Sequence, residues 1–157
     1  MADYLLVIDM QLDYITDGEP YNGRNLVQTV NQKIASYPKK QVIYVINRFW
    51  WELGKKPKVF ADGLSIVSNQ IFEKRRASCF SNQQLRSFLE NNEANCLEII
   101  GVDGNACVNK SVLEALNYGY QVSVDLLCLG VSNRKKFQKT LKNWRRHRVL
   151  VRGENYR

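Results

Sequence analysis

The chain has little of what several classes of protein depend on. Its 157 residues include one histidine, His147, and its four cysteines form no CxxC pair. A histidine-based zinc site, or a Ser–His or Cys–His relay, would have to recruit that one histidine, so we expect neither. No apolar run approaches the roughly 18 residues of a membrane helix, and Leu5–Ile8 is too short for a signal peptide. We therefore expect one domain, residues 1–157, in a cytoplasmic protein that does not contact membranes.

The excess of positive charge lies at one end of the sequence. The formal net charge is +8, yet residues 1–132 carry 13 Lys/Arg and 14 Asp/Glu, whereas residues 133–157 carry 10 basic side chains and one acidic one. This pattern favours a surface helix and tail, residues 133–157, whose cations are solvated. Binding of nucleic acid or an acidic partner is the alternative, and it would weaken steeply with salt. Because the first 132 residues are nearly neutral, we do not expect nucleic acid to be the principal partner.

Strand-like segments alternate along the chain with segments in which apolar residues recur at helical spacing. Residues 4–9 form a nearly continuous apolar run, which is typical of a strand buried on both faces, and residues 41–47, 96–102, 121–127 and 148–151 also read as strands. We place a further short strand near residues 71–74. Helical spacing or capping residues predict helices over 26–37, from 81 to about 89, over 105–118 and over 132–146. This βα order predicts an α/β fold with a mostly parallel sheet covered by helices on both faces.

Three reactive side chains fall at the carboxyl ends of predicted strands, where ligands bind in sheets of this class. Asp9 ends the first strand, Lys74 ends a short middle strand, and Cys107 opens a helix just after another. Each residue alone has a structural explanation as well as a catalytic one. The aspartate could cap a turn, the lysine could be a solvated surface cation, and the cysteine could be a packing residue. Together they form a set for nucleophilic attack on a carbonyl carbon.

The chemistry expected of this set follows from the residue types. A thiolate is the reactive form of cysteine, and a helix N-terminus and a nearby ammonium both favour it, so we expect the pKa of Cys107 to fall by about one to two units. Asp9 would take the thiol proton and return it to the leaving group. The backbone N–H groups of Ala106 and Cys107 would hold the oxyanion.

The same residues lie in motifs that resemble those of the isochorismatase-like cysteine hydrolase family. Residues 9–14 (DMQLDY) resemble its DxQxD[FY] opening, and residues 72–74 (FEK) with 78–80 (SCF) resemble its catalytic lysine segment. Residues 101–108 (GVDGNACV) resemble its GxxxxxCV nucleophile motif. The resemblance runs in order from Asp9 to about Asp125.

The resemblance implies a fold, an activity and an assembly. The fold is a Rossmann-like three-layer sandwich with about six strands, and the site is a catalytic triad of Asp9, Lys74 and Cys107. It also implies a non-proline cis peptide at Val102–Asp103 and a homo-oligomer. The metal-binding histidines of nicotinamidase-like members are missing after the second strand, so we predict no metal and no cofactor. The cysteine favours hydrolysis of a small-molecule amide or related C–N bond, and a catalytically weak or inactive binding or regulatory protein is the alternative.

Further residues are candidates for binding substrate or the oxyanion beside this triad. Gln11 and Tyr14 belong to the first motif, and Val102 and Asp103 precede the nucleophile. Trp50 follows the second strand, at the edge expected to hold the pocket, although packing in the core or at an interface explains it equally well.

Overall fold

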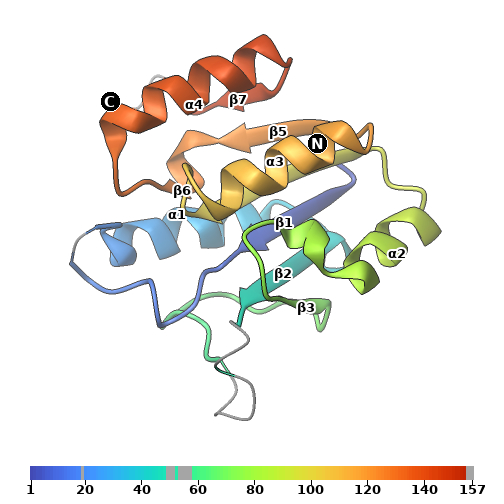
Figure 1. The fold of residues 1–157 in the computed structure, drawn as a ribbon. Coiled ribbons are helices and arrows are strands. Elements are labelled where there is room, and N and C mark those ends of the chain that lie inside the picture. Colours follow the sequence, from blue (N-terminus) through green and yellow to red (C-terminus); the bar gives the residue numbers. More distant parts are fainter. Residues whose placement is uncertain (19, 49–51, 53–57, 155–157) are drawn as a thin grey trace.

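The computed structural model describes residues 1–18, 20–48, 52 and 58–154. Its helices and strands follow the predicted order (Figure 1). The strands are β1 (Tyr4–Ile8), β2 (Val42–Asn47), β3 (Ile71–Lys74), β4 (Cys96–Val102), β5 (Gln121–Asp125), β6 (Leu129–Gly130) and β7 (Leu150–Arg152). The α-helices are α1 (Gly23–Ala35), α2 (Gln83–Asn91), α3 (Cys107–Asn117) and α4 (Arg134–Arg146). None of the helices in these described ranges is long and apolar enough to cross a bilayer.

The strands form one parallel sheet. Its order is β3-β2-β1-β4-β5-β7, with the short β6 paired to the end of β4, which gives seven strands among the described residues. The predicted α/β fold with a mostly parallel sheet is therefore confirmed. The chain winds outward from β1 in one direction and from β4 in the other, so the order reverses between these two strands. A reversal of this kind leaves a crevice at the carboxyl edge, where ligands bind in such sheets.

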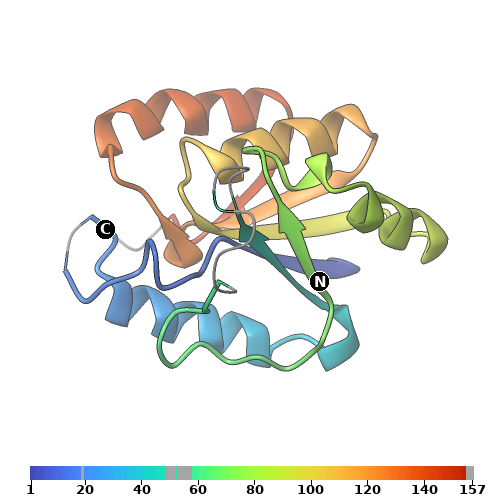
Figure 2. The same ribbon diagram turned by 60° about the horizontal axis from the view of Figure 1, so that its bottom comes forward.

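Helices cover both faces of the sheet in three layers. Figure 2 shows α1 on one side and α2, α3 and α4 on the other. Alternate residues of β1 supply the two cores: Leu6 and Ile8 pack under α2, α3 and α4, whereas Leu5 and Val7 pack against α1. All four side chains are at most 1 % exposed. Burial of both faces explains why β1 reads as an uninterrupted apolar run.

In two helices the capping residue lies one position after the predicted serine, Ser81 or Ser132. The Asn82 side chain accepts a hydrogen bond from the Leu85 N–H at the start of α2, and Asn133 does the same for the Lys136 N–H at the start of α4. Asn caps a helix as well as Ser does. The side chain of Ser132 has another partner, described below.

Candidate active site

Asp9 lies directly after β1 at the carboxyl edge of the sheet. Its backbone has φ of 53°, and its N–H donates to the Val45 carbonyl at 2.9 Å. These features turn the chain out of the sheet at the reversal between β1 and β4. The Asp9 residue is 1 % exposed, so its carboxylate is buried among neighbouring groups.

Lys74 reaches the same point from the edge of the sheet. It ends β3, where it pairs in register with Asn47 of β2, and it is 1 % exposed. Its Nζ lies 3.0 Å from Asp9 Oδ2 and 3.4 Å from Cys107 Sγ. The ammonium therefore bridges the carboxylate and the sulfur, two groups nearly 100 residues apart in sequence.

Cys107 is the first residue of α3 and lies half-buried over the end of β1. Burial and the charge of Asp9 raise the pKa of this thiol to about 11, while Lys74 opposes them. The expected fall in its pKa is therefore wrong. Sequence shows a helix N-terminus and a lysine, but it does not show how deeply the sulfur is buried or that a carboxylate faces it.

The pKa of Asp9 is also raised, because burial outweighs the charge of Lys74 and the hydrogen bond with the Cys107 thiol. Its second oxygen, Oδ1, has no N–H or O–H hydrogen-bond donor among the described residues. A carboxylate with raised pKa is a better proton acceptor than an ordinary aspartate. Cys107 is therefore a thiol at neutral pH, and it lies beside a carboxyl group whose affinity for a proton is raised.

The turn before Cys107 presents backbone donors. The Val102–Asp103 peptide is cis, as expected. The Ala106 N–H donates to the Asp103 carbonyl at 3.0 Å, so it is used inside the turn. Within the described residues, the N–H groups of Asp103 and Cys107 donate to no acceptor. These two, rather than the expected pair of Ala106 and Cys107, are the amides left to meet an oxyanion.

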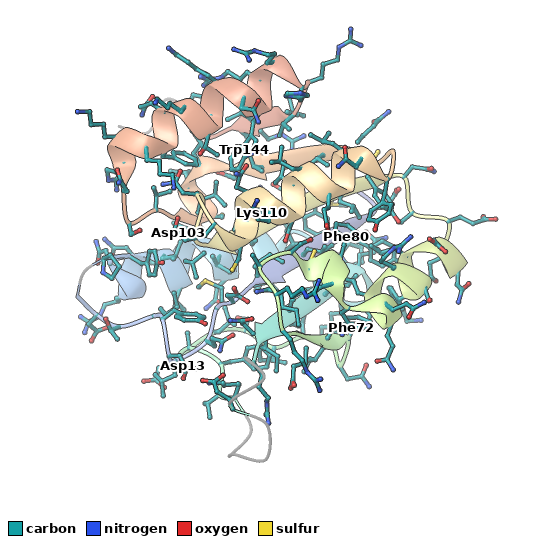
Figure 3. All side chains as sticks on the ribbon, viewed as in Figure 1. Asp13, Phe72, Phe80, Asp103, Lys110 and Trp144 are labelled. Carbon is teal, nitrogen blue, oxygen red and sulfur yellow. The ribbon has the colours of Figure 1, made fainter. Side chains whose placement is uncertain are left out.

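The Asp103 side chain holds this turn in place. Its Oδ2 accepts hydrogen bonds from the Ser132 N–H at 3.0 Å, the Ser132 hydroxyl at 2.7 Å and the Tyr21 hydroxyl at 3.1 Å. Its Oδ1 accepts from the Asn105 N–H at 2.7 Å. Figure 3 shows Asp103 where the beginning of α3 faces the beginning of α4. The carboxylate thus links the nucleophile turn to segments before α1 and α4.

The structure places Gln11 as a support for the site. It is fully buried; its Oε1 accepts from the Asn47 N–H at 2.8 Å and its Nε2 donates to the Asn47 carbonyl at 3.1 Å. The oxygen and the nitrogen of this side-chain amide both bind the backbone of Asn47, at the end of β2. This clamp fixes the ends of β1 and β2 relative to each other, next to Asp9.

Asn47 is a site residue that the sequence reasoning missed. It is 2 % exposed, and its Nδ2 donates to the Tyr14 hydroxyl at 2.9 Å, while its Oδ1 has no partner among the described residues. Burial raises the pKa of Tyr14, while the hydrogen bond with Asn47 opposes this and the charge of Asp9 adds to it. The bond from Asn47, the last residue of β2, holds the Tyr14 hydroxyl at the carboxyl edge of the sheet. The sequence did carry a signal for Asn47, because it is a polar residue at the end of a buried strand, as Asp9 and Lys74 are.

The other candidates lie elsewhere. The Val102 side chain is 2 % exposed and packs in the core on the α1 side. Trp50 lies outside the described residues. In the described part of the chain, no three His, Cys, Asp or Glu side chains converge as a metal site would require. His147 is the C-cap residue of α4, with its ring nitrogen Nδ1 2.8 Å from the Asn143 carbonyl oxygen.

Comparisons with known proteins agree with this architecture. The model of the isochorismatase domain family matches residues 3–152. No curated protein matches the sequence significantly. Among solved structures, the nicotinamidase of Staphylococcus aureus is 23 % identical, with 95 % of this chain and 97 % of that one covered and a TM-score of 0.78.

Two further structures have the same fold. An isochorismatase-like hydrolase from Alkaliphilus metalliredigens is 17 % identical, covers 99 % of this chain and 97 % of its own, and has a TM-score of 0.79. The pyrazinamidase of Pyrococcus horikoshii, solved with zinc, is 20 % identical, covers 96 % and 98 %, and has a TM-score of 0.77. At these identities the likeness establishes the fold.

Proposed function

The chain belongs to the isochorismatase domain family, and we propose that it is a cofactor-free cysteine hydrolase that cleaves an amide or related C–N bond of a small molecule. The observation that carries the proposal is the contact of Lys74 Nζ with both Asp9 and Cys107, at 3.0 and 3.4 Å. Three ionisable groups from separate elements, buried together at the ligand-binding edge of the sheet, are typical of a catalytic site.

The first half of the proposed reaction forms a thioester. Cys107 Sγ attacks the carbonyl carbon while the thiol proton passes to Asp9, so no free thiolate has to accumulate at neutral pH. The carbonyl oxygen becomes an oxyanion, which the N–H groups of Asp103 and Cys107 stabilise. The C–N bond then breaks, and Asp9 returns the proton to the departing nitrogen, which leaves as ammonia or an amine.

The second half regenerates the enzyme. Water replaces the amine, Asp9 takes a proton from it, and the resulting hydroxide attacks the thioester carbon. The C–S bond breaks, the acid product leaves, and the sulfur regains its proton from Asp9. Throughout, the Lys74 ammonium stabilises whichever neighbour carries the negative charge, the Asp9 carboxylate at rest or the sulfur as it is released.

Amide hydrolysis is favoured over other chemistry for two reasons. Cysteine forms acyl intermediates readily, and the buried Asp9 supplies the proton that an amine leaving group needs. The neighbours named nicotinamidase and pyrazinamidase are named for amide substrates. The zinc of the Pyrococcus structure has no counterpart in our scheme, because the donor set among the described residues does not suit it.

The test is a screen of small primary amides and ureides with ammonia release as the readout. The wild type is compared with Cys107→Ala and with Cys96→Ser, a control cysteine variant at the beginning of β4, the end of that strand away from the carboxyl edge. We expect release from at least one compound, loss in Cys107→Ala by several orders of magnitude, and no change in Cys96→Ser. Intact-protein mass spectrometry should detect an acyl adduct that disappears in Cys107→Ala.

The result also separates the enzyme from the inactive alternative. If no compound in the panel yields ammonia or an adduct, while the same compounds protect the protein against thermal unfolding, the chain is a binding or regulatory member of the family. Equal ammonia release by the wild type and Cys107→Ala would rule out the proposed nucleophile.

A further inference from the structure

Helix α4 has two sharply different faces. Its apolar stripe, Phe137, Leu141 and Trp144, is at most 7 % exposed and packs into the core; Figure 3 shows Trp144 between α4 and the rest of the molecule. The remaining surface is exposed and carries seven cations and no acid: Arg134, Lys135, Lys136, Lys139, Lys142, Arg145 and Arg146. Among the described residues, only Arg145 of these seven has an ion pair, with Glu154.

The cations at the beginning of α4, and the like-charge pairs along it, work against the helix itself. Arg134, Lys135 and Lys136 occupy the first turn, where the helix dipole favours acids and disfavours cations. Like charges also follow one another at helical spacing, from Lys135 to Lys139 and from Lys142 to Arg146, which destabilises a helix. Stability alone would not select such a face, so the face points to a polyanionic partner whose charge offsets these costs.

The cations on α4 form a line suited to a row of phosphates. Lys135, Lys139, Lys142 and Arg146 follow one another at spacings of three or four residues, so they lie on one side of the helix. At about 1.5 Å per residue the line is roughly 16 Å long. Each strand of a duplex carries one phosphate per about 3.4 Å of the duplex axis, so a helix face of this length can contact several phosphates.

We propose that the exposed face of α4 binds the phosphodiester backbone of nucleic acid without reading its sequence. Membrane-binding helices bury an apolar face in the lipid, whereas the apolar stripe of α4 is already buried in the core of the protein. Stacking on single-stranded bases requires exposed rings, and both aromatic side chains of α4, Phe137 and Trp144, are buried. Among the ways of binding nucleic acid, contact with the phosphodiester backbone is the one that fits this face.

The test measures fluorescence anisotropy of labelled duplex DNA, duplex RNA and single strands with the full chain as salt is varied. For four phosphate contacts, the logarithm of the affinity should fall against the logarithm of salt with a slope of about −3 to −4. Lys139→Gln/Lys142→Gln should reduce the slope by about 2 and the affinity roughly tenfold or more near 0.1 M salt. The matched control, Lys39→Gln/Lys40→Gln, removes the same charge from the exposed η1 turn (Lys39–Gln41) and should bind as the wild type does.

A second variant separates binding from folding. In Lys135→Glu/Lys136→Glu the dipole argument predicts a higher melting temperature together with weaker binding, whereas cations kept for packing would give a lower melting temperature. The proposal is overturned if no nucleic acid binds at about 50 mM salt, or if both lysine pairs weaken binding equally. It is equally overturned if the chain binds phosphatidylserine vesicles and no nucleic acid.

Discussion

Replacing Asp9 by Asn should make Cys107 more reactive toward alkylation while it abolishes turnover. The substitution keeps the shape of the side chain but removes the charge that raises the pKa of the thiol. In a site where a carboxylate only positioned the cysteine, its loss would leave the sulfur unchanged or less reactive. The opposite signs of the two effects make this variant informative.

The size of the effect follows from the geometry. Lys74 touches both groups, at 3.0 and 3.4 Å, so the Asp9 carboxylate and the sulfur face each other across one ammonium. Unit charges near 4 Å interact by about 4 kcal/mol at an effective dielectric constant of 20, and even two-thirds of this is about two pKa units. The pKa of Cys107, about 11 in the wild type, would then fall to about 9. At neutral pH the thiolate fraction rises about a hundredfold, the lower basicity of the sulfur offsets about tenfold of this, and the net gain is about tenfold.

The assay is the rate of iodoacetamide labelling of Cys107 from pH 6 to 10, followed by peptide mass spectrometry. Asp17→Asn, which removes an equally negative but exposed charge, is the control and should label as the wild type does. A wild-type labelling rate that titrates at or below the free-cysteine value of about 8.5 would refute the reasoning. So would slower labelling of Asp9→Asn.

Three substitutions test the framework that holds the site, each by urea denaturation. Gln11→Ala leaves the N–H and carbonyl of Asn47 buried without partners and should cost about 1–3 kcal/mol for each group. Gly101→Ala should prevent folding or destabilise by more than about 1 kcal/mol, because Gly101 has φ of 118° and a Cβ there would overlap the Ile8 carbonyl. Trp144→Ala empties a fully buried position and should cost about 3–5 kcal/mol. Unchanged stability in any one of them would contradict the packing described for that residue.

Much of the fold was predictable because burial on both faces leaves a plain pattern. The bounds of β4, Cys96–Val102, match the run that predicted them, and β3, Ile71–Lys74, lies where a short strand was expected. The short strand β6 was missed, since Leu129–Gly130 is too short for any periodicity and pairs only with the end of β4. Helix α1 begins at Gly23, before Leu26, the first apolar residue of the predicted helix. A Cβ at position 23 would overlap the Thr16 carbonyl oxygen.

The sequence was enough to predict which residues meet at the site, but not the direction in which their pKa values shift. Parallel strands end at one edge, so Asp9, Lys74 and Cys107 were expected together, and the contacts of Lys74 bring them together. The direction of the Cys107 pKa was not predictable, because it depends on the depth of burial and on which charge faces the sulfur. The choice between Ala106 and Asp103 as an oxyanion donor depends on one hydrogen bond inside a turn, which no sequence pattern encodes.

The hydrogen bonds that hold the nucleophile turn have a practical consequence for truncating this protein. Besides the bonds from Ser132 to the Asp103 carboxylate, the Asn105 side chain donates to the Asn133 carbonyl and accepts from Thr140. Deleting residues 133–157 would remove both partners of the Asn105 side chain. A truncated chain should therefore lose the proposed activity because its nucleophile turn is no longer held in place. Only point substitutions on the exposed face of α4 can separate its proposed binding of nucleic acid from its support of the nucleophile turn.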